Sequence, residues 1–338
     1  MDTINALVIG DPHFMVTNIE EVEELVKKIL LIVEHNNYDF VVVLGDILHT
    51  HEKIHVTPFK MAIRFLRLLS KKVHTFLIIG NHDYINNQQF LTDNHAFNSL
   101  KKWDNMTVCD KVRIKQIKGH KFVFCPYVPP DRFIEALDTL IQKGKNWDDA
   151  TCIFAHQEFY GCLLNPVMKS EQGDTWPEDY PLVISGHIHQ EQRLQSNIYY
   201  PGSCMQHSFG EHGTKTIAHV TFNSPTDFKI NKIDLEMKHK KIIYLDIDKV
   251  DDFFPKPNEI IKLVLRGTSQ QFKLFRRCNK YKELIKRNVR IVFVPSKILS
   301  DDDTQTVRKQ NVLDILKDLI KEDDEYVQEG FQQLVYLK

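Results

Sequence analysis

Five apolar runs of strand length, each followed by side chains that can bind a metal ion, constrain the fold of this chain more than any other feature. The clearest is LVISGHIH at Leu182–His189, where the run ends at Gly186 and His187 and His189 follow. An apolar run stopped by a glycine is typical of a buried strand that leads into a loop. The other four runs are followed, in chain order, by Asp11 and His13, by Asp46, by Asn81, His82 and Asp83, and by His156.

Helical patterns lie between the first of these strands. Apolar residues recur at helical spacing from Ile19 to Val33, with Thr17 or Asn18 as the expected side-chain cap, and a second helix is predicted over 58–69. A strand–helix–strand unit makes its two strands parallel. Open α/β sheets hold ligands at the carboxyl ends of such strands. We therefore expect the side chains after the five strands to meet at one edge of a sheet.

The rest of the chain suggests three domains. Further helices are predicted over 88–103 and 132–142, and 157–181 is a long polar loop. The helices over 58–69 and 88–103 are interpreted as covers of the sheet, with a dimer surface as the alternative. The proposed boundaries give a main domain over 1–238, a small basic α/β unit over 239–299 with one helix near 270–286, and a tail over 300–338. The tail carries two amphipathic patterns, which either pack on their own domain or bind a partner.

Composition restricts the class of protein. The chain has 338 residues, 42% of them hydrophobic and 26% charged, which is ordinary for a globular protein. No run approaches the ~20 apolar residues that span a bilayer, and no export signal is visible at the N-terminus, so no membrane partner and no secretion are expected. The six cysteines form no CxxC pair. This favours free thiols in a reducing compartment, cytoplasmic or nuclear, over disulfides or a thiolate zinc site.

The formal net charge of −1 conceals an asymmetry along the chain. Residues 229–290 contain 17 Lys and Arg against 8 Asp and Glu, a balance of +9, so the remainder carries −10. A solvated lysine-rich surface is the simpler interpretation. A basic unit beside an acidic, metal-binding site also suits a polyanionic substrate.

Each of these potential ligands is weak evidence when taken singly. An aspartate after a strand is often a helix cap, and the Gly45-Asp46 and Gly80–Asp83 segments could be ordinary turns. As a set, the oxygen and imidazole groups without thiolate suit Mn²⁺, Fe²⁺ or Zn²⁺. Two such ions can share a carboxylate, lower the pKa of a water and stabilise the charge of a phosphate under attack. The residues therefore indicate a binuclear metallophosphoesterase.

The order of these motifs resembles a known superfamily. DxH, GD, GNHD, H and GHxH, in this order, are similar to the calcineurin-like metallophosphoesterases. His49, three residues past Asp46, together with YPGS at 200–203 and SFGE at 208–211, resembles the DNA double-strand-break repair nucleases of the SbcD or meiotic-recombination-eleven type. The resemblance covers about residues 4–222. It implies an α/β fold, a β-sandwich flanked by helices, followed by a small α/β capping domain and a helical tail.

The resemblance also implies a role for each motif residue. Asp11, His13 and His189 would hold one metal ion, Asn81, His156 and His187 the other, and Asp46 would bridge them. His82 would be the transition-state stabiliser or general acid, with Asp83 orienting its ring, and His49 would contact the substrate phosphate or assist proton transfer. The two divalent ions would be Mn²⁺, with Mg²⁺, Fe²⁺ or Zn²⁺ as alternatives. The sequence departs from the family pattern at Phe14-Met15, which replace the usual Leu-Gly.

The function implied by the resemblance is that of a Mn²⁺-dependent DNA exonuclease or endonuclease in a repair or recombination complex. Its expected partners are DNA, gripped by the basic unit, and an SMC-like coiled-coil ATPase of the SbcC type, docked on the tail helices of a homodimer. A phosphatase or small-molecule phosphodiesterase with the same metal core is the alternative. A non-catalytic scaffold is a third reading, although such a protein would be expected to have lost ligands.

Overall fold

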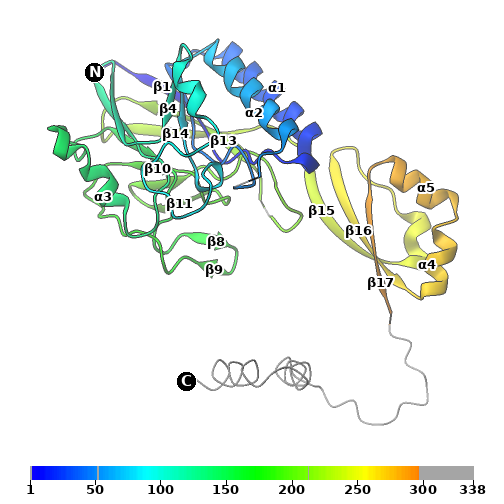
Figure 1. Ribbon diagram of the computed structural model, residues 1–338. Helices are drawn as coiled ribbons and strands as arrows, with labels where there is room; N and C mark the ends of the chain where they lie inside the picture. The colour runs from blue at the N-terminus through cyan, green and yellow to red at the C-terminus, as the bar shows by residue number, and fades with distance from the viewer. Residues whose placement is uncertain (1, 52, 212, 297–338) are drawn as a thin grey trace, which may run out of the picture.

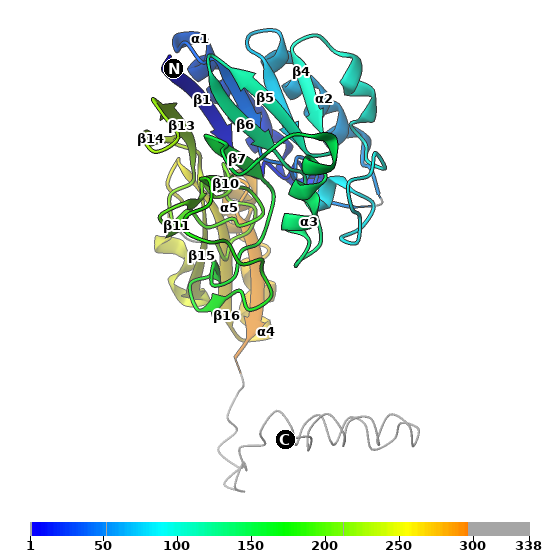
Figure 2. The same cartoon turned by 90° about the vertical axis from the view of Figure 1, so that its left-hand side faces the viewer.

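A computed structural model describes residues 2–51, 53–211 and 213–296 of the chain, in which two six-stranded sheets pack face to face (Figures 1 and 2). The first sheet has the order β14 (Phe228–Asp234), β13 (Thr216–Phe222), β1 (Ile4–Ile9), β2 (Phe40–Val43), β3 (Thr75–Ile78) and β4 (Met106–Cys109). Strands β1 to β4 are parallel, whereas β13 is antiparallel to β1 and to β14. The parallel arrangement predicted for the first strands is confirmed.

The second sheet repeats this design. Its order is β11 (Gln192–Gln195), β12 (Ile198–Tyr200), β10 (Val183–Ser185), β7 (Cys152–Ala155), β6 (His120–Phe124) and β5 (Arg113–Ile117). The four inner strands are parallel and the two edge strands antiparallel. The predicted fold class, an α/β sandwich flanked by helices, is therefore confirmed.

Burial on both faces explains why the inner strands, such as β1, β2, β3, β7 and β10, are almost wholly apolar. In β1, Ala6 and Val8 point into the core between the sheets, whereas Leu7 and Ile9 point to the covering helices. Phe76 of the first sheet and Phe124 of the second stack across the interface, with ring centroids 4.0 Å apart. Side chains of the two sheets thus form one shared core.

Helices α1 (Ile19–His35) and α2 (Val56–Ser70) cover the outer face of the first sheet, and α3 (Phe133–Asp138) packs on the second. The prediction of a helix over 88–103 is wrong, because only a 3₁₀ turn forms there, at Asn98–Lys102. Side chains compete with helical hydrogen bonds in this segment. Thr92 accepts a bond from the amide of Asn94, and Asn98 donates to the carbonyl of Asp93.

The expected side-chain cap of α1 is also absent. Asn18 precedes the helix, but its amide donates to the carbonyl of His13 at 3.0 Å and its oxygen accepts from the amide of Met15 at 2.8 Å. Asn18 therefore stabilises the loop after β1 instead of the helix. Farther along, the long loop over 157–181 contains a small hairpin of β8 (Leu163–Asn165) and β9 (Met168–Lys169).

A separate three-stranded parallel sheet follows the sandwich, and Figure 1 shows it at the right. It consists of β15 (His239–Asp246), β16 (Glu259–Gly267) and β17 (Arg290–Pro295), with α4 (Ser269–Phe275) and α5 (Asn279–Lys286) packed on it around a core of its own. The single helix predicted near 270–286 is thus two helices. Lys240 links this unit to the sandwich, since its ammonium group lies 3.1 Å from the carboxylate of Glu21.

The tail helices predicted within 300–338 lie outside the described residues. In the described part of the chain, no helix combines the length and apolar character needed to cross a membrane.

Candidate metal centre

The seven predicted metal ligands lie together at the carboxyl ends of strands from both sheets. Four of them, Asp11, His13, Asp46 and His187, have positive φ values, between 34° and 77°. A positive φ is unfavourable for residues other than glycine. Such residues adopt it where contacts with the surrounding structure require it, often at functional sites. The loops after β1, β2 and β10 are therefore held in strained conformations at the positions that present these side chains.

The first group of side chains comprises Asp11, His13 and His189. Nε2 of His13 lies 3.0 Å from Nε2 of His189, and the latter lies 3.9 Å from Oδ2 of Asp11. Glu211 lies 3.7 Å from Nδ1 of His189, on the other side of its ring. A carboxylate placed there orients an imidazole and makes its free nitrogen a better ligand.

The second group comprises Asn81, His156 and His187. Oδ1 of Asn81 lies 3.0 Å from both Nε2 of His156 and Nδ1 of His187. Nδ1 of His156 donates to the carbonyl of Leu44 at 2.6 Å, which leaves Nε2 with the lone pair. On the outer side, Glu158 lies 3.4 Å from Nε2 of His187.

Asp46 lies between the two groups. Its Oδ2 is 3.5 Å from Nε2 of His13 and 3.4 Å from Nε2 of His156. Burial opposes its ionisation, but the neighbouring His156 and His13 hold the pKa of Asp46 well below its usual value. An ionised carboxylate in this position can serve both groups at once. The structure thus brings all seven predicted ligands into two groups with a shared carboxylate.

The donor set fits divalent cations. Both carboxylate oxygens of Asp11 are buried and have no hydrogen-bond partner among the described residues, and burial raises the pKa of this group. An unpaired buried carboxylate is costly unless a cation compensates it. Ligand atoms of Asp11, His13 and Asp46 lie within 4.8 Å of one another, and so do those of Asp46, His156 and His187. Two ions held by oxygen and imidazole ligands would satisfy both sets.

Glycines allow these ligands to approach one another. A Cβ atom on Gly186 would lie 2.6 Å from Oδ1 of Asp11, and one on Gly80 would lie 2.2 Å from Oδ1 of Asp46. Neither position can carry a side chain without moving a ligand. The glycines that end the third and fifth apolar runs are therefore required by close packing.

His82 and His49 lie beside the first group. One ring nitrogen of each lies within 4.8 Å of a ring nitrogen of His13, and the rings of His49 and His82 are nearly parallel. Nδ1 of His82 donates to the carbonyl of His49 at 2.7 Å, which leaves Nε2 free to exchange a proton. Burial lowers the pKa of both imidazoles.

The expectation that Asp83 orients the ring of His82 is not what the structure shows. Its carboxylate accepts hydrogen bonds of 3.1 Å from the backbone amides of Leu48 and Gly80. Burial and the charge of Asp46 raise the pKa of Asp83 to about 7. Asp83 therefore fixes the two loops that carry Asp46 and Asn81, and the carbonyl of His49 orients the His82 ring.

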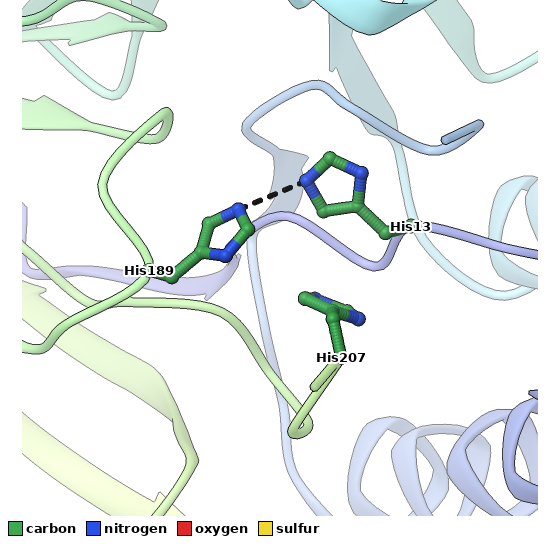
Figure 3. Close-up of side chains that lie close together, drawn as sticks. All are labelled: His13, His189 and His207. Carbon is green, nitrogen blue, oxygen red and sulfur yellow. Dashed lines mark hydrogen bonds between the residues drawn. The ribbon is translucent and has the colours of Figure 1, made fainter. Parts of the chain in front are cut away.

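Four residues at the site were given no role from the sequence, although Glu211 belongs to the SFGE segment. His51 stacks on His82 with ring centroids 4.6 Å apart, and Glu158 and Glu211 support the ligand histidines. The fourth is His207, which lies against His13 and His189 (Figure 3). Burial and the neighbouring His189 lower the pKa of His207 to about 3. The SFGE segment, which directly follows His207, is the sequence feature that could have pointed to it.

Comparison with known proteins agrees with this geometry. Residues 4–191 match the family described as Calcineurin-like phosphoesterase. The chain is 41% identical over 324 residues to "Putative phosphoesterase 078R" of Invertebrate iridescent virus 3, covering 94% of this chain and 92% of the relative. It is 44% identical over 289 residues to "Putative phosphoesterase 244L" of Invertebrate iridescent virus 6, covering 82% of this chain and 99% of the relative. The chain therefore belongs to the calcineurin-like phosphoesterase family.

Proposed function

We propose that this chain is a Mn²⁺-dependent DNA nuclease, with exonuclease and endonuclease activity, that acts as the catalytic subunit of a double-strand-break repair or recombination complex. Hydrolysis of phosphoesters with divalent metal ions is the chemistry of its family. DNA as the substrate and Mn²⁺ as the ion are specific to this proposal and are not implied by membership of the family.

The pairing of His82 with His49 at the edge of the metal centre is the observation that carries the proposal. A phosphodiester has a poor leaving group, an alkoxide, which must be protonated as its bond to phosphorus breaks. Nε2 of His82 is free for this task, because Nδ1 is engaged by the carbonyl of His49. The His49 ring stacks parallel to that of His82, with centroids 5.6 Å apart, and is proposed to bind a non-bridging phosphate oxygen.

The chain's own residues divide the remaining work. The two divalent ions, when bound, would lower the pKa of the attacking water and neutralise phosphate charge. Asp46 would be the carboxylate that holds both ions, and its Oδ1 accepts a 2.8 Å hydrogen bond from the amide of His82. The same carboxylate therefore contacts both ligand groups and the backbone of the proposed acid, His82.

The surroundings of the site suit a polymer better than a small molecule. An open cavity of about 580 Å³ beside His82 is lined by His49, Thr50, His51, Lys53, Ile85, Asn86 and Asn87. The segment 229–290, with its balance of +9, forms β14 and most of the three-stranded unit. Lys and Arg side chains there can bind backbone phosphates without reading sequence. The domain predicted over 239–299, to which the three-stranded sheet belongs, is proposed as the part that caps the site over bound DNA.

The proposal includes two protein partners. A second copy of the chain would pair through the region of α2, and an SMC-like coiled-coil ATPase would dock on residues 300–338. Deleting 301–338 should abolish binding of such an ATPase and leave nuclease activity of the isolated chain in place. An unchanged complex would place the docking surface elsewhere, and sedimentation of the chain alone would test the dimer.

The decisive experiment is degradation of end-labelled duplex DNA with Mn²⁺, using the wild type and His82→Ser. Wild type alone should release label, and both proteins should bind two metal ions, since His82 is not a ligand. Turnover of a nitrophenyl phosphomonoester without any cleavage of DNA would instead identify a phosphatase. Cleavage of a nitrophenyl phosphodiester but not of DNA would identify a small-molecule phosphodiesterase.

A further inference from the structure

His207 is a histidine at the metal centre that no family motif assigns. It lies in the loop between β12 and β13, whereas His13 and His189 follow β1 and β10 (Figure 3). The His207 ring centroid is 4.7 Å from that of His13 and 5.2 Å from that of His189. The loops after β1, β10 and β12 therefore bring three imidazoles together.

The hydrogen bonds of His207 define which nitrogen is available. Nε2 lies 2.8 Å from the backbone carbonyl of Asp11, which can only accept, so Nε2 carries the proton. Nδ1 is buried and has no hydrogen-bond partner among the described residues. Leaving a buried polar atom without a partner is unfavourable, so this nitrogen needs a partner that the described residues do not provide. The lone pair of Nδ1 can bind a metal ion.

The spacing of the three imidazoles fits a shared ion. One ring nitrogen of each lies within 4.8 Å of one ring nitrogen of the other two. Metal–imidazole bonds are ~2.1 Å long, so two nitrogens on one ion lie at most ~4.2 Å apart. The 4.8 Å limit on the separation of the three nitrogens is close to this value. The hydrogen bond to Asp11 also ties the His207 ring to the loop that supplies the carboxylate ligand.

We propose that Nδ1 of His207 binds the first metal ion together with Asp11, His13, His189 and the bridging Asp46. A third imidazole favours ions that prefer nitrogen ligands, such as Co²⁺, Fe²⁺ and Zn²⁺, over Mn²⁺ and Mg²⁺. His207 thus makes the first site tighter and more selective than the second. The inference rests on the metal-dependent chemistry proposed above and is independent of the substrate.

Two variants separate a ligand from a structural support. His207→Gln places an amide nitrogen where Nε2 was, so it can keep the hydrogen bond to Asp11 while removing the lone pair of Nδ1. His207→Ala removes both the hydrogen bond to Asp11 and the lone pair of Nδ1. His219→Gln is the matched control, because His219 lies on β13 and bonds with Asn5 outside the centre. Thermal unfolding of the metal-free proteins establishes that each variant folds.

Calorimetric titration with Co²⁺ and with Mn²⁺, together with the visible absorption of bound Co²⁺, gives the readout. Wild type and His219→Gln should bind two ions. His207→Gln and His207→Ala should both lose at least ~10-fold in affinity at one site, more for Co²⁺ than for Mn²⁺, with an altered Co²⁺ spectrum. Wild-type affinity and spectrum in His207→Gln would overturn the assignment, even if His207→Ala bound poorly.

A measurement on the wild type covers the case in which the variants do not fold. Histidine ¹⁵N NMR during Zn²⁺ loading should show two rings bound through Nδ1, His187 and His207, whereas one such ring would overturn the proposal. Binding of two ions without cleavage of DNA would refute the nuclease and leave the result for His207 intact.

Discussion

The backbone amide of His82 donates a 2.8 Å hydrogen bond to Oδ1 of Asp46. This contact leaves Oδ2 of Asp46 to face His13 and His156, at 3.5 and 3.4 Å. The residue proposed to protonate the leaving group is thereby attached to the carboxylate that joins the two ligand groups. Any change that moves Asp46 should therefore affect metal binding and acid catalysis together.

Asp46→Ala should reduce bound Mn²⁺ from two ions per chain to one or none, because each ligand group loses the oxygen that it shares with the other. Activity on any phosphoester should fall by at least ~10³-fold, as expected when a metal centre no longer assembles. Elemental analysis after gel filtration measures the metal. Asp227→Ala, on an exposed turn, is the control. Two tightly bound ions in Asp46→Ala would contradict the shared position.

Gly80→Ala tests the packing of the centre without touching a ligand. The new Cβ would lie 2.2 Å from Oδ1 of Asp46 and 2.4 Å from its backbone nitrogen, so the loop after β3 must move. We expect loss of one metal ion and destabilisation of about 1–3 kcal/mol, typical of overpacking. Gly210→Ala is the control, since its Cβ would meet only the Ser208 hydroxyl, at 3.9 Å. Normal metal content in Gly80→Ala would show that the loop tolerates the shift.

The same packing explains what the sequence could predict and what it could not. Parallel strands buried on both faces produce apolar runs, and the ligands follow at fixed offsets, so Asp11, Asp46 and His187 could be located from local patterns. His207 and Glu158 lie in long loops, and their positions depend on contacts between segments far apart in the chain. The prediction of a helix over 88–103 was wrong for a related reason. Its apolar spacing suits a helix, but side-chain hydrogen bonds such as that of Asn98 to Asp93 select an irregular loop.

Glu158→Gln should weaken the second ligand group selectively. Glu158 lies 3.4 Å from Nε2 of His187, whose Nδ1 faces Asn81. Removing a carboxylate that orients a ligand imidazole typically costs 10–100-fold in metal affinity, about 1.4–2.7 kcal/mol. Calorimetry should show one weakened Mn²⁺ site and one unchanged site. Glu171→Gln, an exposed change in the same loop, should leave both sites intact. Equal weakening of both sites would mean that Glu158 acts on the fold rather than on His187.

Asp110→Asn should reveal a pH-dependent contribution to stability away from the metal centre. Burial opposes ionisation of Asp110, but hydrogen bonds from His95 and Lys101 lower its pKa to about 2. Because this pKa is depressed from 3.8, the stabilisation is complete above about pH 4 and is lost as the pH falls towards 2.

Urea unfolding of metal-free protein should show Asp110→Asn to be about 1–2 kcal/mol less stable than wild type at pH 7, with the difference shrinking steadily between pH 4 and pH 2. Asp149→Asn, which removes an exposed carboxylate paired with Lys121, should change the free energy of unfolding by less than about 0.5 kcal/mol at either pH. A difference for Asp110→Asn that stays constant from pH 7 to pH 2 would mean that packing, rather than charge, makes Asp110 stabilising.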